Sequence, residues 1–334
     1  MHFSIIIPVY NRPIEVQELL ESLSQQDYIN QFEIVIVEDG STNDCKSVVN
    51  SFIQLLDISY FYKENSGPGA SRNYGMQRAK GDYFIIFDSD CVIPKGYLAD
   101  VAKNLGENYI DCFGGPDGAQ KSFSNIQKAI NFAMTSFLTT GGIRGGNEKI
   151  TNFEPRSFNM GLSKKAFEIS GGFGQIHPGE DPDLSIRLWK LGFKTALLSD
   201  AFVYHKRRIN WRKFYAQVNK FGKARPILNA WHPKYAKLTY FFPTFFIITF
   251  TLSLFLFIAS MPIYLYLFLA YYFSIFMQSS IVNKSIFVGF LSIIAVFIQF
   301  FGYGFGFLNS FIKIFIFKIK PENAFPELFF NKTS

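Results

Sequence analysis

Two carboxylates separated by one residue follow an apolar stretch and could hold a cation. Asp88-Ser89-Asp90 comes directly after residues 83–87, which the pattern predicts to be a buried strand. Residues two apart in extended backbone point the same way, so we expect both side chains to converge. Paired anionic oxygens suit a hard divalent ion, Mg²⁺ or Mn²⁺, that also binds phosphate oxygens. Acidic turns are common, but Asp39 also ends a predicted strand, which favours a binding site.

Strands that alternate with helices would bring such side chains together. Apolar runs predict strands at 3–9, 32–37, 58–62 and 83–87, and helical spacing predicts helices at 14–26, from 43, from 67 to about 81, and at 184–191. This order indicates a mostly parallel sheet that is covered on both faces. Ligands of such sheets bind beyond the carboxyl ends of the strands, where we expect Tyr10, Asn11, Arg12, Asp39, Asp88 and Asp90.

The 334 residues fall into three regions of different charge. Residues 1–204 hold 18 basic and 24 acidic residues, 205–240 hold ten basic and no acidic ones, and 241–334 hold only seven charges. A hydrophobic content of 49% excludes a disordered chain. A nucleic-acid-binding protein would be expected to carry its basic residues on the folded body, so the net charge of +7 does not favour nucleic acid as a partner.

Cysteine spacing and the N-terminal sequence both point to the cytoplasm. Cys45, Cys91 and Cys112 are an odd number and lie far apart in sequence. They predict neither a disulfide framework nor a C-x-x-C zinc site, and they favour reduced thiols. The first apolar run has neither a basic flank nor a small-residue cleavage site, so we predict no signal peptide.

The C-terminal region is apolar enough to cross a membrane. Uncharged segments at 241–259, 262–281 and 286–308 are each long enough for a helix to cross most of a ~30 Å hydrocarbon core. A buried hairpin in a soluble protein is disfavoured, because too little polar sequence remains to cover so much apolar surface. The basic segment 205–240 then belongs in the cytoplasm, beside anionic membrane lipids.

The side of the C-terminus is left open by the sequence. Lys313, Lys318 and Lys320 favour a C-terminus on the cytoplasmic side of the membrane. Three crossings that start from the cytoplasm would place it on the other side. One segment could therefore be re-entrant, or residues 311–319 could form a helix along the interface.

Five motifs follow one another along the first 225 residues. They are SIIIPVYNR at 4–12, IVIVEDGS at 34–41, GPGASRNYG at 67–75, DSD at 88–90, and GGF with GEDPDL between 171 and 184. Together they resemble glycosyltransferase family 2, whose members are inverting enzymes with the GT-A nucleotide-sugar fold. The resemblance implies an α/β catalytic domain at 1–225. Outside the resemblance, composition predicts a basic collar at 205–240, about three transmembrane helices within 241–319 and a short polar tail at 320–334.

The family implies a nucleotide-sugar donor and a metal ion. Asp39 would accept hydrogen bonds from the base or ribose of a UDP-type donor. The whole set implied for donor binding is Pro8, Tyr10, Asn11, Arg12, Asp39, Gly69, Arg72, Asp88 and Ser89. Mn²⁺ or Mg²⁺ would be held by Asp88, Asp90 and, as in several GT-A enzymes, His205. A surface histidine at the start of the basic collar is an equal alternative for His205.

The family also implies a catalytic base on the acceptor side of the sugar. Asp181 would take the proton of the attacking hydroxyl, with Glu180 beside it. The alternative is an acidic helix start, which Pro182 fits, although the upstream motifs favour catalysis. Residues implied for the donor-sugar and acceptor pocket are Asn159, Met160, Gly161 and His177.

One departure from the family concerns polymer synthesis. Gln217 is followed by VNKF rather than by the x-x-Arg-Trp of processive members, which favours the addition of one or a few sugars. We expect transfer to a lipid-linked or glycan acceptor at the cytoplasmic membrane face, in polysaccharide or cell-envelope synthesis. A polyprenyl-phosphate glycosyltransferase and a non-catalytic, nucleotide-sugar-binding membrane scaffold are the alternatives.

Overall fold

The computed structural model describes four stretches of the chain, which group into two compact units. The described stretches are 1–118, 123–141, 153–206 and 210–330. By contacts between residues, the sheet unit comprises 1–120, 146–206 and 329–334, and the helical unit comprises 121–145 and 207–328. Each unit is therefore assembled from separated parts of the sequence. The extent of the catalytic domain, 1–225, stays a prediction.

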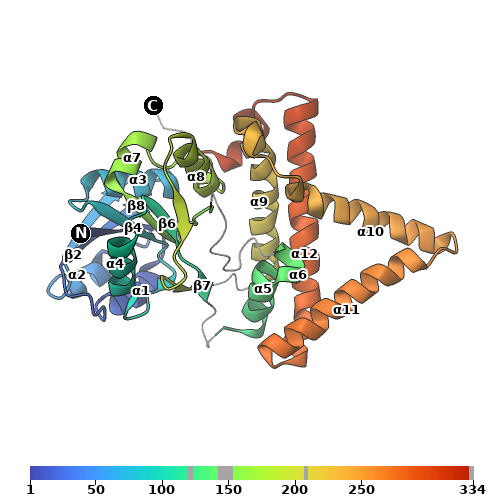
Figure 1. Cartoon of the computed structure of the whole chain (residues 1–334), viewed down its shortest axis with the longest axis horizontal. Coiled ribbons are helices and arrows are strands. Elements are labelled where there is room, and N and C mark those ends of the chain that lie inside the picture. Colours follow the sequence, from blue (N-terminus) through green and yellow to red (C-terminus); the bar gives the residue numbers. More distant parts are fainter. Residues whose placement is uncertain (119–122, 142–152, 207–209, 331–334) are drawn as a thin grey trace. The chain divides into compact units, whose positions relative to one another are not determined.

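The sheet unit is built on a mixed sheet (Figure 1). Among the described residues this sheet has seven strands in the order β3-β2-β1-β4-β8-β6-β9, and β8 runs antiparallel to both of its neighbours while the other pairs are parallel. The strands are β1 Phe3–Val9, β2 Phe32–Asp39, β3 Ile58–Lys63, β4 Tyr83–Phe87, β6 Cys112–Gly114, β8 Asn159–Ser163 and β9 Thr195–Leu197. The four strands predicted from apolar runs are confirmed.

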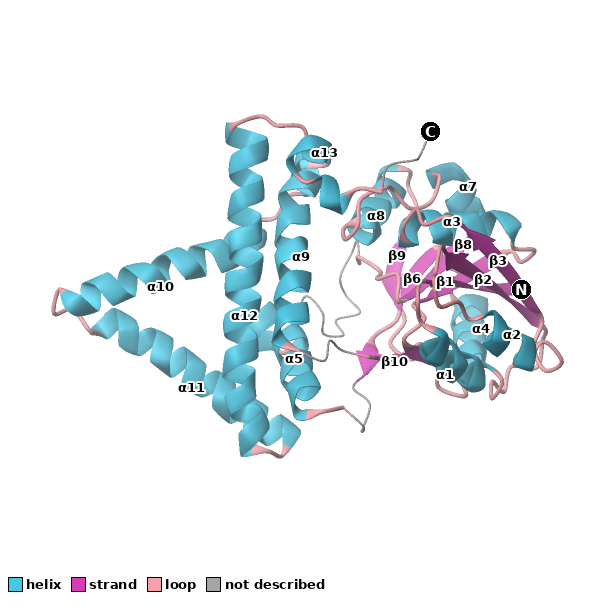
Figure 2. Ribbon diagram, turned by 180° about the vertical axis from the view of Figure 1, so that it is seen from behind, coloured by secondary structure: helices cyan, strands magenta, loops and turns pink. Residues whose placement is uncertain are grey.

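Helices cover both faces of this sheet, as the unbroken apolarity of its strands predicts (Figure 2). One face packs against α1, α2 and α4, and the other packs against α3, α7 and α8. Their bounds are α1 Pro13–Leu23, α2 Lys46–Phe52, α3 Pro68–Arg78, α4 Tyr97–Glu107, α7 Lys164–Ser170 and α8 Glu180–Lys190. Successive residues of one strand face opposite layers: in β1, Ile5 and Ile7 join the first core and Ile6 joins the second.

A small sheet at one end of the unit brings distant residues together. It has the order β5-β10-β7, and its strands are β5 Cys91–Val92, β7 Asp117–Gly118 and β10 Val203–His205. His205 is paired with Cys91 across the antiparallel ladder, and Val203 is paired with Asp117 across the parallel one. All three cysteines of the chain are buried and free, as predicted.

The helical unit contains the basic segment as well as the apolar ones. Its elements are α5 Asn125–Thr135, α6 Phe137–Thr140, α9 Trp211–Trp231, 3₁₀ turns at Pro233–Tyr235 and Leu238–Phe241, α10 Phe242–Ile258, α11 Ile263–Asn283, α12 Ile286–Phe311, a π-helical turn at Ile312–Ile316, α13 Pro321–Ala324 and a last 3₁₀ turn at Pro326–Leu328. Much of the basic segment is therefore a helix, α9, which lies along α12 (Figure 1). Glycines make this approach possible, because a Cβ on Gly222 would overlap the backbone of Tyr303 and one on Gly306 would overlap that of Asn219.

Three described helices are long and apolar enough to cross a membrane: 238–258, 263–283 and 286–316. The last has 31 residues, roughly 46 Å at ~1.5 Å per residue, which exceeds a ~30 Å hydrocarbon core. Its π-helical turn directly continues α12. Residues 312–316 are thus continuous with α12, and an interfacial position of 311–319 stays a prediction.

Candidate active site

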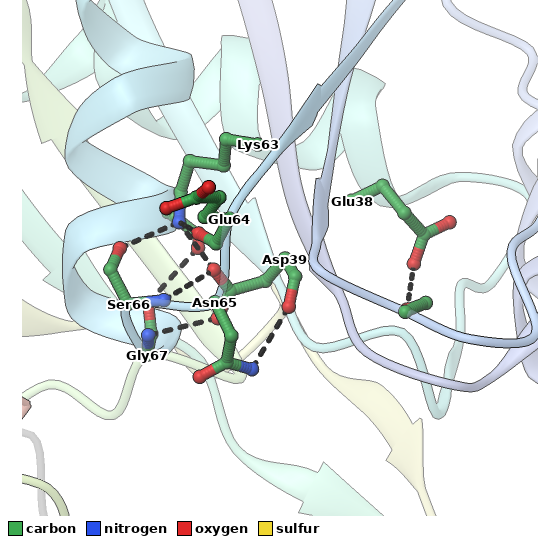
Figure 3. Close-up of polar contacts among 9 residues, drawn as sticks. Glu38, Asp39, Lys63, Glu64, Asn65, Ser66 and Gly67 are labelled. Carbon is green, nitrogen blue, oxygen red and sulfur yellow. Dashed lines mark hydrogen bonds and ion pairs between the residues drawn. The ribbon is translucent and has the colours of Figure 1, made fainter.

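The carboxylate of Asp39, at the end of β2, is enclosed by the segment that leads into α3 (Figure 3). Its two oxygens accept hydrogen bonds from the backbone N–H groups of Ser66 and Gly67, both at 2.9 Å, and it also pairs with Lys63. Asn65 donates from its side-chain amide to the Asp39 carbonyl at 2.9 Å. Asp39 thus shapes the loop that opens α3, and Lys63 is a partner that sequence reasoning did not find.

The side chain of the neighbouring Glu38 points away from Asp39 and has a structural role (Figure 3). Its carboxylate is fully buried, where it accepts hydrogen bonds from Ser41, from the Cys45 amide at 2.9 Å and from Tyr60 at 3.3 Å. Asn11 has a φ of 55° and accepts from the amides of Thr42 and Asn43, at 3.0 and 2.9 Å. The loops after β1 and β2 are therefore held to each other.

Arg72 of α3 joins the two acidic motifs. Its side chain is buried, and it donates to Asp88 at 2.7 Å and to Glu180 at 3.1 Å. The guanidinium also lies 5.2 Å from the centre of the Phe173 ring. Burial opposes the charged form, but the carboxylates of Asp88 and Glu180 raise the pKa of Arg72, so it stays protonated. One guanidinium therefore spans residues 108 positions apart in sequence.

Glu180 begins α8 and is buried between two basic groups. Its Oε1 atom lies 2.8 Å from Nδ1 of His177 and 3.1 Å from Nη1 of Arg72. Burial alone would raise the pKa of Glu180, but His177 and Arg72 lower it below its usual range. Glu180 carries a fixed negative charge that positions its neighbours. The helix itself starts at Glu180 rather than at the predicted residue 184, so the acidic run forms its first turn, where negative charge is stabilised.

Asp181 differs electrostatically from Glu180. Burial and the adjacent Glu180 charge raise the pKa of Asp181 to about 6, against the opposing charge of Arg72. Its Oδ1 atom is buried and has no hydrogen-bond partner among the described residues. A carboxylate with an unpartnered oxygen and a raised pKa is suited to accepting a proton near neutral pH.

His205 lies beside Asp90, as the metal hypothesis requires. The Nε2 atom of His205 is 3.2 Å from Asp90 Oδ1, and its Nδ1 atom is 3.9 Å from Asp117 Oδ2. The imidazole stacks on Phe158 with ring centres 4.7 Å apart. Burial opposes its charged form, but the carboxylates of Asp90 and Asp117 raise the pKa of His205 to about 9. Asp117 is a further acidic group that sequence reasoning missed, since its loop could not be placed.

The chemistry of this donor set fits a hard divalent cation. Asp90, Cys91 and His205 each offer one ligand atom within 4.8 Å of the others. Burial and the nearby Asp90 raise the pKa of the Cys91 thiol well above its usual value, so its sulfur stays protonated and is a poor ligand. Carboxylate oxygen and imidazole nitrogen remain, which suits Mn²⁺ better than a thiophilic metal, and the ion would displace the proton that Asp90 and Asp117 stabilise on His205. Arg12 also donates to Asp90 at 3.2 Å and would have to share it with the ion.

The structure does not bring every predicted residue to the site surface. Asn159, Met160 and Gly161 are the first three residues of β8 and are buried. The Asn159 amide accepts from the Tyr97 hydroxyl at 2.5 Å and donates to the Ala201 carbonyl at 2.7 Å. The part of these three residues in the donor-sugar and acceptor pocket stays a prediction. Gly69 is buried against Gly174, whereas Tyr10 is exposed at the end of β1.

Two side chains that the motifs did not single out hold the GGF segment. Asn73 of α3 bonds both the N–H and the C=O of Phe173, at 2.8 and 2.9 Å. Arg187 of α8 donates to the carbonyls of Ser170 and Gly172, and it pairs with Asp183 at 2.9 Å. Asp183 therefore serves the helix and this loop.

The fold and site define a glycosyltransferase of the GT-A type. A family model described as Glycosyl transferase family 2 matches residues 4–170, half of the chain. The chain belongs to glycosyl transferase family 2.

Two curated relatives show how far the likeness extends. A poly(ribitol-phosphate) beta-N-acetylglucosaminyltransferase, TarS, from Staphylococcus aureus is 36% identical over 114 residues, which cover 33% of this chain and 20% of TarS. A GalNAc(5)-diNAcBac-PP-undecaprenol beta-1,3-glucosyltransferase from Campylobacter jejuni is 32% identical over 197 residues, 56% of this chain and 59% of that protein. The matched stretches thus span less than two thirds of either relative.

Solved structures share the fold at low sequence identity. The crystal structure of S. aureus TarS 1-349 superposes with a TM-score of 0.52 and 23% identity, covering 69% of this chain and 65% of that one. A mannosyltransferase from Pyrobaculum calidifontis, solved with GDP-Man and Mn²⁺, gives a TM-score of 0.54 and 18% identity, covering 70% and 65%. These likenesses establish the GT-A fold.

Proposed function

We propose that this chain is a membrane-attached, inverting glycosyltransferase that moves one sugar from a UDP-sugar to a lipid-linked or glycan acceptor at the cytoplasmic membrane face. The observation that carries the proposal is the double ion pair of Arg72, which places the Asp88 motif and the Glu180-Asp181 motif one guanidinium apart. A donor sugar is small enough to contact both motifs at once.

In the proposed reaction Asp181 acts as the general base. Its unpartnered oxygen accepts the proton of the acceptor hydroxyl while that oxygen bonds to the anomeric carbon and the bond from that carbon to the nucleoside diphosphate breaks. The transition state has oxocarbenium character, by analogy with glycoside hydrolysis. Burial and the charge of Glu180 raise the pKa of Asp181, and the charge of Arg72 lowers it.

Asp90 and His205 would hold a divalent ion, with Asp88 beside them. When bound, the ion offsets the negative charge that develops on the departing diphosphate. Arg72, whose positive charge the Asp88 and Glu180 carboxylates stabilise, supplies a second positive group on the Asp88 side. Asp39 and the loop it organises are the proposed site of the base or ribose.

The acceptor and location rest on further support. The Campylobacter relative is named for a PP-undecaprenol-linked glycan acceptor, and both relatives are named for beta products, which an α-linked nucleotide-sugar gives by inversion. Three candidate membrane helices and the basic collar favour attachment with the sheet unit on the cytoplasmic side.

Chelation should remove most of the activity. If Asp90 and His205 hold a divalent ion, EDTA should lower UDP-sugar turnover by about 10²-fold or more, since a metal contributes several kcal/mol to the transition state. Mn²⁺ added in excess should restore the rate. The Asp90→Asn variant should need more Mn²⁺ for half-maximal activity, and Asp100→Asn, an exposed carboxylate on α4, should not. Full turnover in chelator would exclude the metal role.

The pH dependence should report Asp181. A base acts only when deprotonated, and the raised pKa of about 6 moves the acid limb of kcat/KM well above the usual range of an aspartate. Measured between pH 4.5 and 8, kcat/KM should fall as the pH drops through about 6. In Glu180→Gln the adjacent negative charge is gone, so the limb should move to lower pH. A limb that stays near pH 6 in this variant would contradict the assigned cause.

A further inference from the structure

The C-terminal segment of the chain returns to the sheet unit. Phe329 forms an antiparallel bridge with Ile176, and the Phe330 N–H donates to the Gln175 carbonyl at 3.2 Å. Both phenylalanines group with the sheet unit, although residues 207–328, which precede them, belong to the helical unit. The segment is therefore attached by a single β-bridge to the loop that leads to Glu180 and Asp181.

The Phe330 ring lies against the loop that Asp39 organises. Gly67 has a φ of 88°, and a Cβ at this position would overlap the Phe330 ring, so the ring packs directly on the Gly67 backbone. The N–H of Gly67 is one of the donors to the Asp39 carboxylate, at 2.9 Å. Phe330 thus covers the outer side of the loop that is proposed to face the nucleotide.

The same ring also lies beside His177, in the loop that precedes Glu180 and Asp181. Its centre is 6.2 Å from the centre of the His177 ring, at an interplanar angle of 50°. His177 contacts Glu180 at 2.8 Å, and Glu180 contacts Arg72 at 3.1 Å. One half-buried side chain therefore touches both the proposed donor loop and the loop before the base.

We propose that Phe330 is a positioning residue that holds the Gly67 loop and the His177 loop in register, so that the donor site is complete only when the C-terminal segment is docked. The inference rests on the proposed function and extends it. It makes the C-terminal segment, which belongs to the sheet unit, a component of the active site. A ring wedged against a glycine backbone and a neighbouring imidazole fixes both loops without contacting the reacting atoms.

Replacing Phe330 tests this role. Phe330→Ala should raise the KM for UDP-sugar and lower kcat, with a loss in kcat/KM of about ten- to hundredfold, as expected when a loop near the chemistry is misplaced. Phe330→Tyr keeps a ring of the same shape and should retain most of the activity. Asn323→Ala changes an exposed side chain of the same C-terminal stretch and should behave as the wild type. A general loss of folded enzyme would lower kcat alone, so the rise in KM is the diagnostic readout.

Hydrogen exchange provides a readout that does not need turnover. Amides of 64–67 and 175–177 should exchange faster in Phe330→Ala than in the wild type, and those of β1 and β4 should not change. If the wild type itself transfers no sugar, the proposed function fails, and this exchange pattern still decides whether Phe330 holds the two loops. Unchanged kinetics and exchange in Phe330→Ala, or higher activity in that variant, would overturn the proposal.

Discussion

The Asp181→Asn variant should lose sugar transfer by about 10²–10⁴-fold, the range associated with removal of a general base. The asparagine side chain has nearly the same size but cannot accept the proton of the acceptor hydroxyl. The Oδ1 atom of Asp181 has no partner in the described residues, so the substitution should break no hydrogen bond there. UDP binding, measured by calorimetry with Mn²⁺, should therefore stay within about twofold of the wild type.

The control for this variant is Glu168→Gln. Glu168 is an exposed carboxylate on α7, in the same unit, and its neutralisation should leave turnover unchanged. Normal turnover in Asp181→Asn would remove Asp181 from the role of base. If binding and transfer both persisted, an acceptor that attacks through a phosphate oxygen, and so needs no base, would become the better account.

Replacing Arg72 with Met should have the largest effect on stability. The buried guanidinium pairs with Asp88 and Glu180, and its removal leaves both carboxylates without that partner. Breaking a buried pair in this way costs about 3–5 kcal/mol. For a domain of this size each kcal/mol lowers Tm by roughly 2–4 °C, which a thermal unfolding experiment on the purified protein detects. Transfer should be lost as well, because Asp181 and the Asp88 motif would no longer be held together.

Two further variants separate charge from geometry. Arg72→Lys keeps the charge but not the planar fork that donates to two carboxylates, so its activity should fall between wild type and Arg72→Met. Arg78→Met removes an exposed arginine of the same helix, where it stacks on Tyr74, and should change Tm by less than about 2 °C. If Arg72→Met had the Tm and the turnover of the wild type, the ion pairs of Arg72 would neither stabilise the fold nor position the two acidic motifs.

The sequence is informative wherever local pattern and tertiary structure agree. The runs at 3–9 and 83–87 are strands with those bounds, because a short, continuously apolar run fits a strand in a sheet that is covered on both faces. The three apolar segments are likewise helices within a few residues of the expected ends. The juxtaposition of Asp90 with His205 also follows from the family motifs, although the sequence alone left His205 undecided.

What the sequence could not reveal depends on contacts between distant residues. The sequence shows Lys63 only as a lysine at the end of a strand, and the fold pairs it with Asp39. Asp117 belongs to no sequence motif, and the pairing of β7 with β10 brings it close to His205. Asn159 was assigned to the pocket by resemblance to the family, and only the fold shows that its side-chain amide bonds the Tyr97 hydroxyl and the Ala201 carbonyl inside the core. No sequence pattern distinguishes Phe330 from the other phenylalanines, of which the chain has 41 in all, and only the structure shows that its ring packs on Gly67.

A structure of the full chain with UDP and Mn²⁺ tests the central claim most directly. The proposed function predicts an ion bound by Asp90 and His205 and by the diphosphate, with uracil or ribose at the Asp39 loop. It also predicts that the carboxylate of Asp181 lies on the side of the sugar position opposite to the diphosphate. An ion bound elsewhere, or an Asp181 side chain that faces a different cavity from the nucleotide, would contradict the proposed enzyme.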